Sequence, residues 1–195
     1  MSIILQGSTS GSVTLQEPAV AGTTVLDLPA TSGTMALTSN LGVTEADQWY
    51  LTTNVIVGSI PFILTSNFGR VTTGGFSLLG TGMTQSSGVF SFPSTGRWLI
   101  GLNLGFYDNA AAYARCSPCI QTTVNNSTYV DVLIAHGACP PSYSVESCAC
   151  QFVFNVTDTS QCKVRFAITG KDGTVGLYGG NNSMTTVFTF IKLAN

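Results

Sequence analysis

The stretch Ser86-Ser-Gly-Val-Phe-Ser-Phe-Pro-Ser-Thr-Gly-Arg-Trp-Leu-Ile-Gly-Leu-Asn-Leu-Gly-Phe106 indicates how this chain folds. Its second half places large apolar side chains at every second position from Trp98 to Phe106. A period of two over that length predicts a β-strand with one face in a core. The preceding Pro93-Ser-Thr-Gly96 joins a fixed φ to a permissive glycine, as a tight turn needs. The stretch therefore predicts two strands paired as a hairpin.

The same kind of pattern continues from about residue 48 to the end of the chain. Short apolar runs are separated by turn signals such as Gly74-Gly75 and Lys171-Asp-Gly173. Short strands with turns at this spacing predict an all-β fold, an antiparallel sandwich of two sheets. The expected strands cover residues 49–57, 62–64, 76–79, 88–92, 97–107, 114–124, 128–136, 147–156, 162–169, 175–177 and 185–193.

The composition excludes several classes of function. The chain of 195 residues is 44% hydrophobic and 8% charged, with a formal net charge of −2. Its Lys and Arg residues are scattered, whereas nucleic-acid binding needs clustered cations, so we expect no nucleic-acid partner. No apolar run approaches the roughly 20 residues of a membrane helix, so we expect no membrane partner. The N-terminus lacks the basic and apolar regions of a secretory signal, so we expect synthesis in a cytoplasm.

The first part of the chain, residues 1–46, differs from the remainder, residues 47–195. It has no Lys or Arg and few bulky side chains. Because so short a segment cannot close a core alone, it usually needs oligomerisation. We therefore expect a β foot that is ordered by copies of itself or by a larger assembly, with a flexible Ser/Thr/Gly tail as the alternative. The candidates for docking in this foot are Val13, Leu15, Val25, Leu26 and Leu28.

Two predicted strands carry apolar side chains on both faces, one near Trp49 and one near the C-terminus. In an antiparallel sheet, such a strand must cover a second apolar surface. No helical pattern is available to supply that surface, so the simplest partner is another copy of the protein. The candidates for core and self-association interface are Trp49, Leu51, Val55, Val57, Val187, Phe188, Phe190, Ile191 and Leu193.

The six cysteines leave three alternatives open. The first is a set of buried free thiols that act as small hydrophobes. The second is one or more disulfides, with Cys116 and Cys139 the most reachable pair if a turn at Asn125-Asn126 closes a hairpin. The third is zinc, for which Cys116-Ser-Pro-Cys119 has half the required spacing. Since Cys148-Ala-Cys150 is one residue short of the second half, we expect no metal ion and no cofactor.

No pattern indicates catalysis. His136 is the only histidine, and no Gly-x-Ser-x-Gly nucleophile motif accompanies it. The carboxylates, such as Asp108 and Asp131, are isolated along the chain, so no pair suggests glycosidase chemistry. We therefore expect a protein that is not an enzyme.

Several segments resemble known families. Gly88-Val-Phe-Ser-Phe-Pro-Ser-Thr-Gly-Arg-Trp-Leu-Ile100 resembles a hairpin of the tumour-necrosis-factor-like and complement-globular-head jelly rolls, and Thr186–Leu193 is similar to their last inner-sheet strand. Pro18–Thr24, followed by Leu28–Thr34, resembles a recurrent segment of phage tail-fibre and capsid-decoration proteins. Leu79–Phe90 and Asn125–Tyr129 are similar to uncharacterised bacteriophage proteins. The resemblance implies a homotrimeric jelly roll on the outside of a virion, with a foot of three intertwined chains.

Together these expectations describe a non-enzymatic structural protein on the virion exterior, made in the host cytoplasm. As a capsid decoration or cement protein, it would contact the major capsid protein and stabilise the coat. As a tail fibre or adhesin, it would contact tail proteins and bind a host surface glycan. A soluble glycan-binding module is a third alternative, with Tyr143 or Tyr178 as contacts. The absence of heptads or a long repeat between foot and head favours decoration.

Overall fold

The computed structural model describes residues 3–15, 22, 42–108, 113–140, 145–180 and 184–194, with Val13, Leu15 and Ala194 described in their backbone only. Every element in these ranges is a β-strand, which confirms the all-β prediction. No helix in the described ranges is long and apolar enough to cross a membrane. The predicted docking residues Val25, Leu26 and Leu28, and the proposed glycan contact Tyr143, lie outside the described residues.

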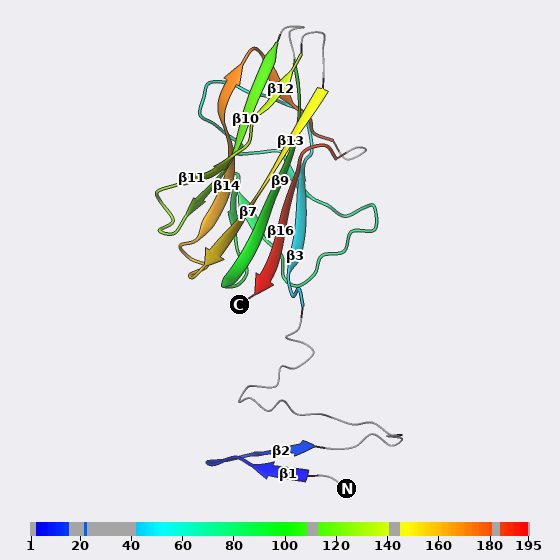
Figure 1. The fold of residues 1–195 in the computed structure, drawn as a ribbon, viewed down its shortest axis with the longest axis vertical. Coiled ribbons are helices and arrows are strands. Elements are labelled where there is room, and N and C mark those ends of the chain that lie inside the picture. The colour runs from blue at the N-terminus through cyan, green and yellow to red at the C-terminus, as the bar shows by residue number, and fades with distance from the viewer. Residues whose placement is uncertain are drawn as a thin grey trace. The chain divides into compact units, whose positions relative to one another are not determined.

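The chain divides into two units, Met1–Leu37 and Thr38–Asn195. In the first unit, β1 (Ile3–Gln6) and β2 (Ser12–Leu15) form an antiparallel hairpin (Figure 1). Its turn is closed by the Gly7 amide, which donates to the Gly11 carbonyl at 2.8 Å. The apolar side chains of Ile3, Ile4 and Leu5 are all more than half exposed. A lone two-stranded hairpin is marginally stable at best, and the described residues of this unit supply no core for its strands.

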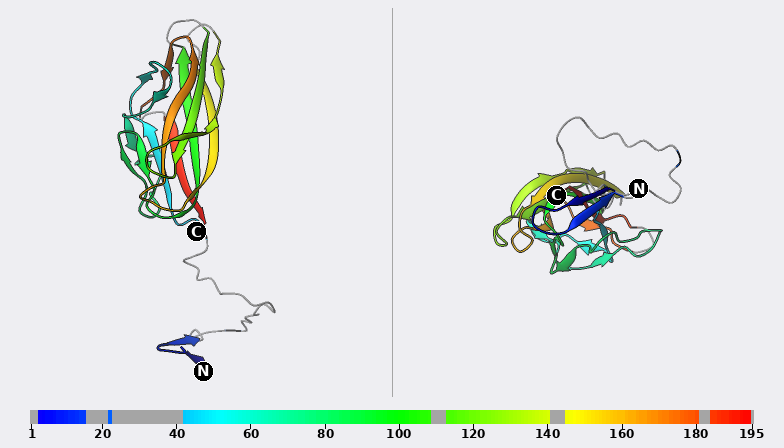
Figure 2. Two further views of the ribbon diagram at one scale, coloured as in Figure 1. Left: turned by 90° about the vertical axis from the view of Figure 1, so that its left-hand side faces the viewer. Right: turned by 90° about the horizontal axis from the view of Figure 1, so that it is seen from below.

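The second unit is a sandwich of two antiparallel sheets, as predicted (Figures 1 and 2). One sheet, here the β9 sheet, contains β3 (Ala46–Leu51), β4 (Val55–Ile56), β6 (Phe68–Arg70), β9 (Gly96–Asp108), β13 (Val145–Val156), β15 (Val175–Leu177) and β16 (Val187–Ala194). The other, here the β14 sheet, contains β5 (Phe62–Ile63), β7 (Thr84–Ser86), β8 (Val89–Ser91), β10 (Ala114–Thr123), β11 (Val130–Ile134), β12 (Gly137–Cys139) and β14 (Lys163–Asp172).

The core lies between the two sheets and follows the alternation seen in the sequence. Trp98, Ile100, Leu102, Leu104 and Phe106 of β9 are all buried, which confirms the predicted period of two. From the β14 sheet, the buried Phe90 ring packs against aromatic rings of both sheets, namely Trp49, Phe68, Phe166, Phe188 and Phe190. Aromatic packing of this kind adds to the free energy gained by burial.

The predicted hairpin between the two halves of Ser86–Phe106 is wrong. β8 pairs with β7 and β14, whereas β9 pairs with β13, β15 and β16. The Pro93–Gly96 turn therefore carries the chain from one sheet to the other. Alternation shows which face of a strand is buried, but it does not show which strand lies beside it. The hairpin that does form joins β7 to β8 through Ser87 and Gly88, both with positive φ.

Two further strand predictions differ from the structure. Residues 76–79 form no strand, and Leu79 makes only an isolated bridge to Ala46. The short strands β6 and β7 were not expected, because Phe68–Arg70 and Thr84–Ser86 carry no alternation long enough to detect. In contrast, β15 begins and ends at the predicted residues.

Candidate functional site

The face of the β9 sheet that points away from the core is the candidate site, here the outer face. Strand register aligns its residues in three rows that run across β13, β9, β16 and β3. The rows are Val153–Leu99–Ile191–Ala46, Gln151–Gly101–Thr189–Gln48 and Ala149–Asn103–Val187–Tyr50. None of these twelve residues is charged, although they cover the middle of a large sheet.

The middle of the outer face is hollow. A hollow of about 150 Å³ lies here, lined by Leu99, Gly101, Leu102, Asn103, Ala149, Cys150, Gln151, Thr189 and Ile191. It forms where Gly101 has no side chain, between the half-buried Leu99 and Ile191. Val153 at the edge of the same face is 51% exposed. The arrangement suits contact with an apolar surface of another molecule, because interface centres are poor in charge.

A second hollow, of about 400 Å³, lies further along β9 and β13. It is lined by Asn103, Gly105, Val145, Glu146, Ser147, Met184 and Thr185. Asn103 lines both hollows, and its side-chain amide donates to the Thr185 carbonyl at 3.1 Å. The second hollow therefore continues the outer face towards the start of β13.

The residues predicted for core and interface separate into two groups. Six of them pack in or against the core, namely Trp49, Leu51, Val55, Val57, Phe188 and Phe190. Val187 and Ile191 are half-buried on the outer face, and Leu193 is 47% exposed near the end of β16. β16 is therefore apolar on both faces, and only the second group stays a prediction for the interface.

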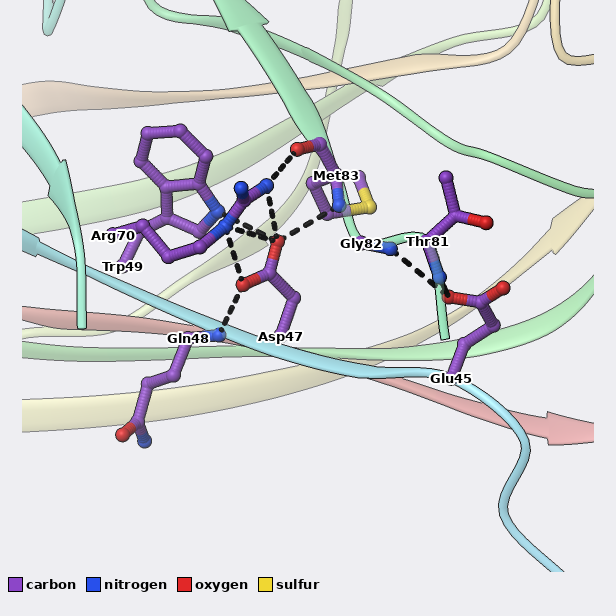
Figure 3. A network of polar contacts seen from close by, with 8 residues as sticks. All are labelled: Glu45, Asp47, Gln48, Trp49, Arg70, Thr81, Gly82 and Met83. Carbon is purple, nitrogen blue, oxygen red and sulfur yellow. Dashed lines mark hydrogen bonds and ion pairs between the residues drawn. The ribbon is translucent and has the colours of Figure 1, made fainter. Parts of the chain in front are cut away.

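A buried ion pair fixes one edge of the same sheet (Figure 3). Asp47 of β3 is 2% exposed and accepts a hydrogen bond from Arg70 Nε of β6 at 3.1 Å. The same carboxylate accepts from Trp49 Nε1 at 2.9 Å and from the Met83 amide at 2.8 Å. Arg70 in turn donates to the Met83 carbonyl. One carboxylate accepts all three hydrogen bonds, so removal of Asp47 would take this acceptor away from Arg70 Nε, Trp49 Nε1 and the Met83 amide.

Glu45 adds a second anchor beside this pair. Its carboxylate accepts hydrogen bonds from the Thr81 and Gly82 amides at 2.8 and 3.1 Å. The two acidic side chains together tie the 79–83 segment to the start of β3. This network was not predicted from the sequence, since Arg70 and residues 81–83 are 23 to 37 residues away from the carboxylates that they contact and no local motif marks them.

All six cysteines are free thiols in the structure, so the alternative of a Cys116–Cys139 disulfide is not the one it contains. Cys116 pairs in register with Gly137, while Cys139 pairs with Ala114. The two cysteines are therefore diagonal neighbours, whose Cβ atoms lie about 7 Å apart, beyond the roughly 4 Å of a disulfide. The alternative of buried thiols describes Cys116, Cys119, Cys139 and Cys162, whereas Cys148 and Cys150 are half-buried.

The remaining candidate residues are engaged in local contacts. His136 Nδ1 shares a hydrogen bond with Ser117 Oγ at 2.9 Å, and Ser117 is buried. Asp131 accepts from the Gln121 side chain at 2.6 Å. Within the described ranges, no group of three or more His, Cys, Asp or Glu side chains is placed to hold a metal ion.

The fold has counterparts among solved structures. The Eiger TNF from S. frugiperda matches with a TM-score of 0.59 and 15% identity, over 77% of this chain and 92% of that one. Murine APRIL matches with a TM-score of 0.54 and 12% identity, over 76% of this chain and 98% of that one. The PRD1 vertex protein P5 matches with a TM-score of 0.46 and 17% identity, over 78% of this chain and 99% of that one.

No protein-family model and no curated protein sequence matches the chain. The likeness to Eiger and APRIL, at identities of 15% and 12%, concerns the fold alone. It confirms the architecture that the sequence resemblance implied, and the second unit is a jelly roll of the tumour-necrosis-factor-like type.

Proposed function

We propose that this protein is a non-enzymatic, homotrimeric structural protein on the exterior of a bacteriophage virion. In this proposal the outer face of the β9 sheet joins three copies, and the N-terminal segment attaches them to the particle. The observation that carries the proposal is the centre of the outer face, where three uncharged rows of residues surround a hollow, opposite a well-packed core.

Self-association explains why β16 is apolar on both faces. Phe188 and Phe190 fill the core, so Val187 and Ile191 are not needed for folding of one chain. An antiparallel sheet can leave one face in water, and that face is then normally polar. Apolar side chains around the hollow at Gly101 instead favour contact with other copies of the chain. A ring-forming contact of this face with the neighbouring copy would close a trimer.

The N-terminal hairpin supports the second half of the proposal. Register pairs Ile3 with Leu15 and Leu5 with Val13, so four apolar positions share one face of β1 and β2. The Ile3 and Leu5 side chains are 59% and 55% exposed in the single chain. Three such hairpins could bury these faces against each other or against the capsid. We propose the foot as residues 1–46, up to the start of β3.

The decoration role is preferred to the fibre role because of the size of the two parts. The described head is one sandwich, and the foot is too short to give the reach of a fibre. In the decoration role the feet would contact the major capsid protein and clamp neighbouring coat subunits.

The proposal is tested by the location and copy number of the protein on purified phage particles. Quantitative mass spectrometry against the major capsid protein should give hundreds of copies per particle, and antibody labelling should mark the capsid exterior. A few dozen copies at the tail would replace the decoration role by the fibre role. Absence of the protein from purified particles would contradict both roles.

A change in the foot separates attachment from folding of the head. The double variant Ile3→Asn, Leu5→Asn should no longer bind particles, while its head unfolds at the wild-type temperature. The matched control Ile4→Asn, Gln6→Asn alters the opposite face of the hairpin and should bind more strongly than the first variant. Full particle binding by the first variant would show that this face of the hairpin does not dock.

A further inference from the structure

Four of the six thiols gather where β10, β12 and β13 meet between the two sheets. Cys116 and Cys139 come from the β14 sheet and are fully buried. Cys148 and Cys150 come from β13 and are half-buried. Their register partners on β9 are Leu104 and Leu102, which are core residues, so both thiols share the inner face of the β9 sheet.

The missing side chain of Gly137 brings Cys148 close to Cys116. Gly137 is the direct register partner of Cys116 on the neighbouring strand. A Cβ atom built at Gly137 would lie only 3.4 Å from the Cys148 Cβ, so Cys148 packs on the position beside Cys116. Cross-strand neighbours have Cβ atoms about 5 Å apart, which places Cys148 within a side-chain rotation of Cys116. The Phe106 ring of β9 packs on the same position, at 2.8 Å from that Cβ.

The electrostatics of the cluster agree with this closeness. Burial, followed by the nearby Cys148 and Cys139 thiols, raises the pKa of Cys116 to about 12. Burial, followed by Cys150 and Cys139, raises the pKa of Cys148 to about 12. The thiols are therefore protonated at neutral pH and react slowly there, since the thiolate is the nucleophile.

We propose that Cys116 and Cys148 form a reversible redox site that takes a small-molecule disulfide and joins the two sheets. The half-buried Cys148 loses its proton, and its thiolate attacks one sulfur of the reagent disulfide. The S–S bond of the reagent breaks, and the other sulfur leaves with the electrons of that bond and takes up a proton. Cys116 then loses its proton and attacks the Cys148 sulfur of the mixed disulfide, and the second reagent thiol leaves. Two protein thiols are oxidised, and one reagent disulfide is reduced to two thiols.

The bond would act on a strand that has one free edge. Among the described strands, β13 pairs only with β9, so its other edge makes no ladder. A covalent link from β13 to β10 would hold this edge strand on the opposite sheet. A bridge across such a loop typically raises the unfolding temperature of a domain of this size by about 5 °C or more. This site does not depend on the proposed location on a virion.

The test is oxidation of the folded full-length protein with oxidised glutathione, followed by peptide mapping and thiol counting. We expect the free thiols to fall from six to four, with Cys116 linked to Cys148. The rate should rise about tenfold for each pH unit below pH 12, because the thiolate fraction rises in that proportion. Reduction with dithiothreitol should restore the six thiols and the original unfolding temperature.

Variants identify the pair. Cys116→Ala and Cys148→Ala should each abolish the bridge and the rise in unfolding temperature. The matched control Cys162→Ala removes a buried thiol outside the cluster and should leave both intact. Six free thiols after oxidation of the wild-type protein, or a bridge that maps to Cys139 in place of Cys116, would overturn the proposal, and both results are obtained without any variant.

Discussion

The two faces of the β9 sheet are made by the same strands but have opposite properties. The inner face carries Trp98, Ile100 and Phe188, which are fully buried within one chain. One residue further along, the outer face carries Leu99, Gly101 and Thr189, which line a hollow and carry no charge. The inner face therefore accounts for the fold, whereas the outer face is explained only by a partner. Substitutions on the two faces should separate folding from assembly.

The largest effect is expected on the inner face, at Phe188. Its ring is fully buried and packs against Phe166 at a centroid distance of 4.5 Å. Phe188→Ala leaves a cavity and should reduce the free energy of unfolding by about 3–5 kcal/mol, measured by urea denaturation. Val187→Ala, its neighbour on the outer face, should cost about 1 kcal/mol or less at the same protein concentration. Equal losses of unfolding free energy in the two variants would contradict the claim that only the inner face is needed for folding.

The next effect is expected at Asp47, the charged exception on the inner face, where its register partner is Phe190. Asp47→Ala leaves Arg70, Trp49 and the Met83 amide without their acceptor and should cost about 3 kcal/mol or more of unfolding free energy. The control Asp172→Ala breaks the Arg115–Asp172 pair, whose side chains are 49% and 56% exposed. This change should cost less than about 1 kcal/mol, because water screens exposed pairs. Similar costs would show that burial of Asp47 contributes little.

A smaller effect on folding, but a distinct one on assembly, is expected on the outer face. Ile191→Lys places a charge beside the hollow and should change the free energy of unfolding of one chain by less than about 1 kcal/mol. It should weaken self-association by at least about tenfold, since a charge buried in an interface is costly. Sedimentation measures the association, and unchanged association would exclude this face as the interface.

The buried face of a long strand could be predicted from the sequence, because alternation of apolar and polar side chains reports burial directly. The apolar parity of β9 predicted its buried face, whereas the two-sided pattern of β16 predicted apolar side chains on both faces without separating core from interface. Strand pairing could not be predicted in the same way. The assignment of β8 and β9 to one hairpin failed, since a Pro-x-x-Gly turn fits a crossing between sheets as well as a turn within one.

The Asp47–Arg70 contact and the thiol cluster also could not be predicted from the sequence. Asp47 and Arg70 are brought together by pairing of β3 with the three-residue strand β6, which has no detectable pattern. Buried thiols were one of three alternatives for the cysteines, and the Cys116–Cys139 pair of the disulfide alternative would need a register that β10 and β12 do not have. The closeness of Cys116 to Cys148 depends on packing between sheets, for which sequence spacing carries no signal.

The central claim is that the outer face of the β9 sheet joins three copies of the chain. It is tested most directly by sedimentation equilibrium of the full-length protein at micromolar concentration, with Ile191→Lys in parallel. We predict a species of three 20.4-kDa chains for the wild-type protein and smaller species for the variant. A wild-type protein that sediments only as a monomer would contradict the claim.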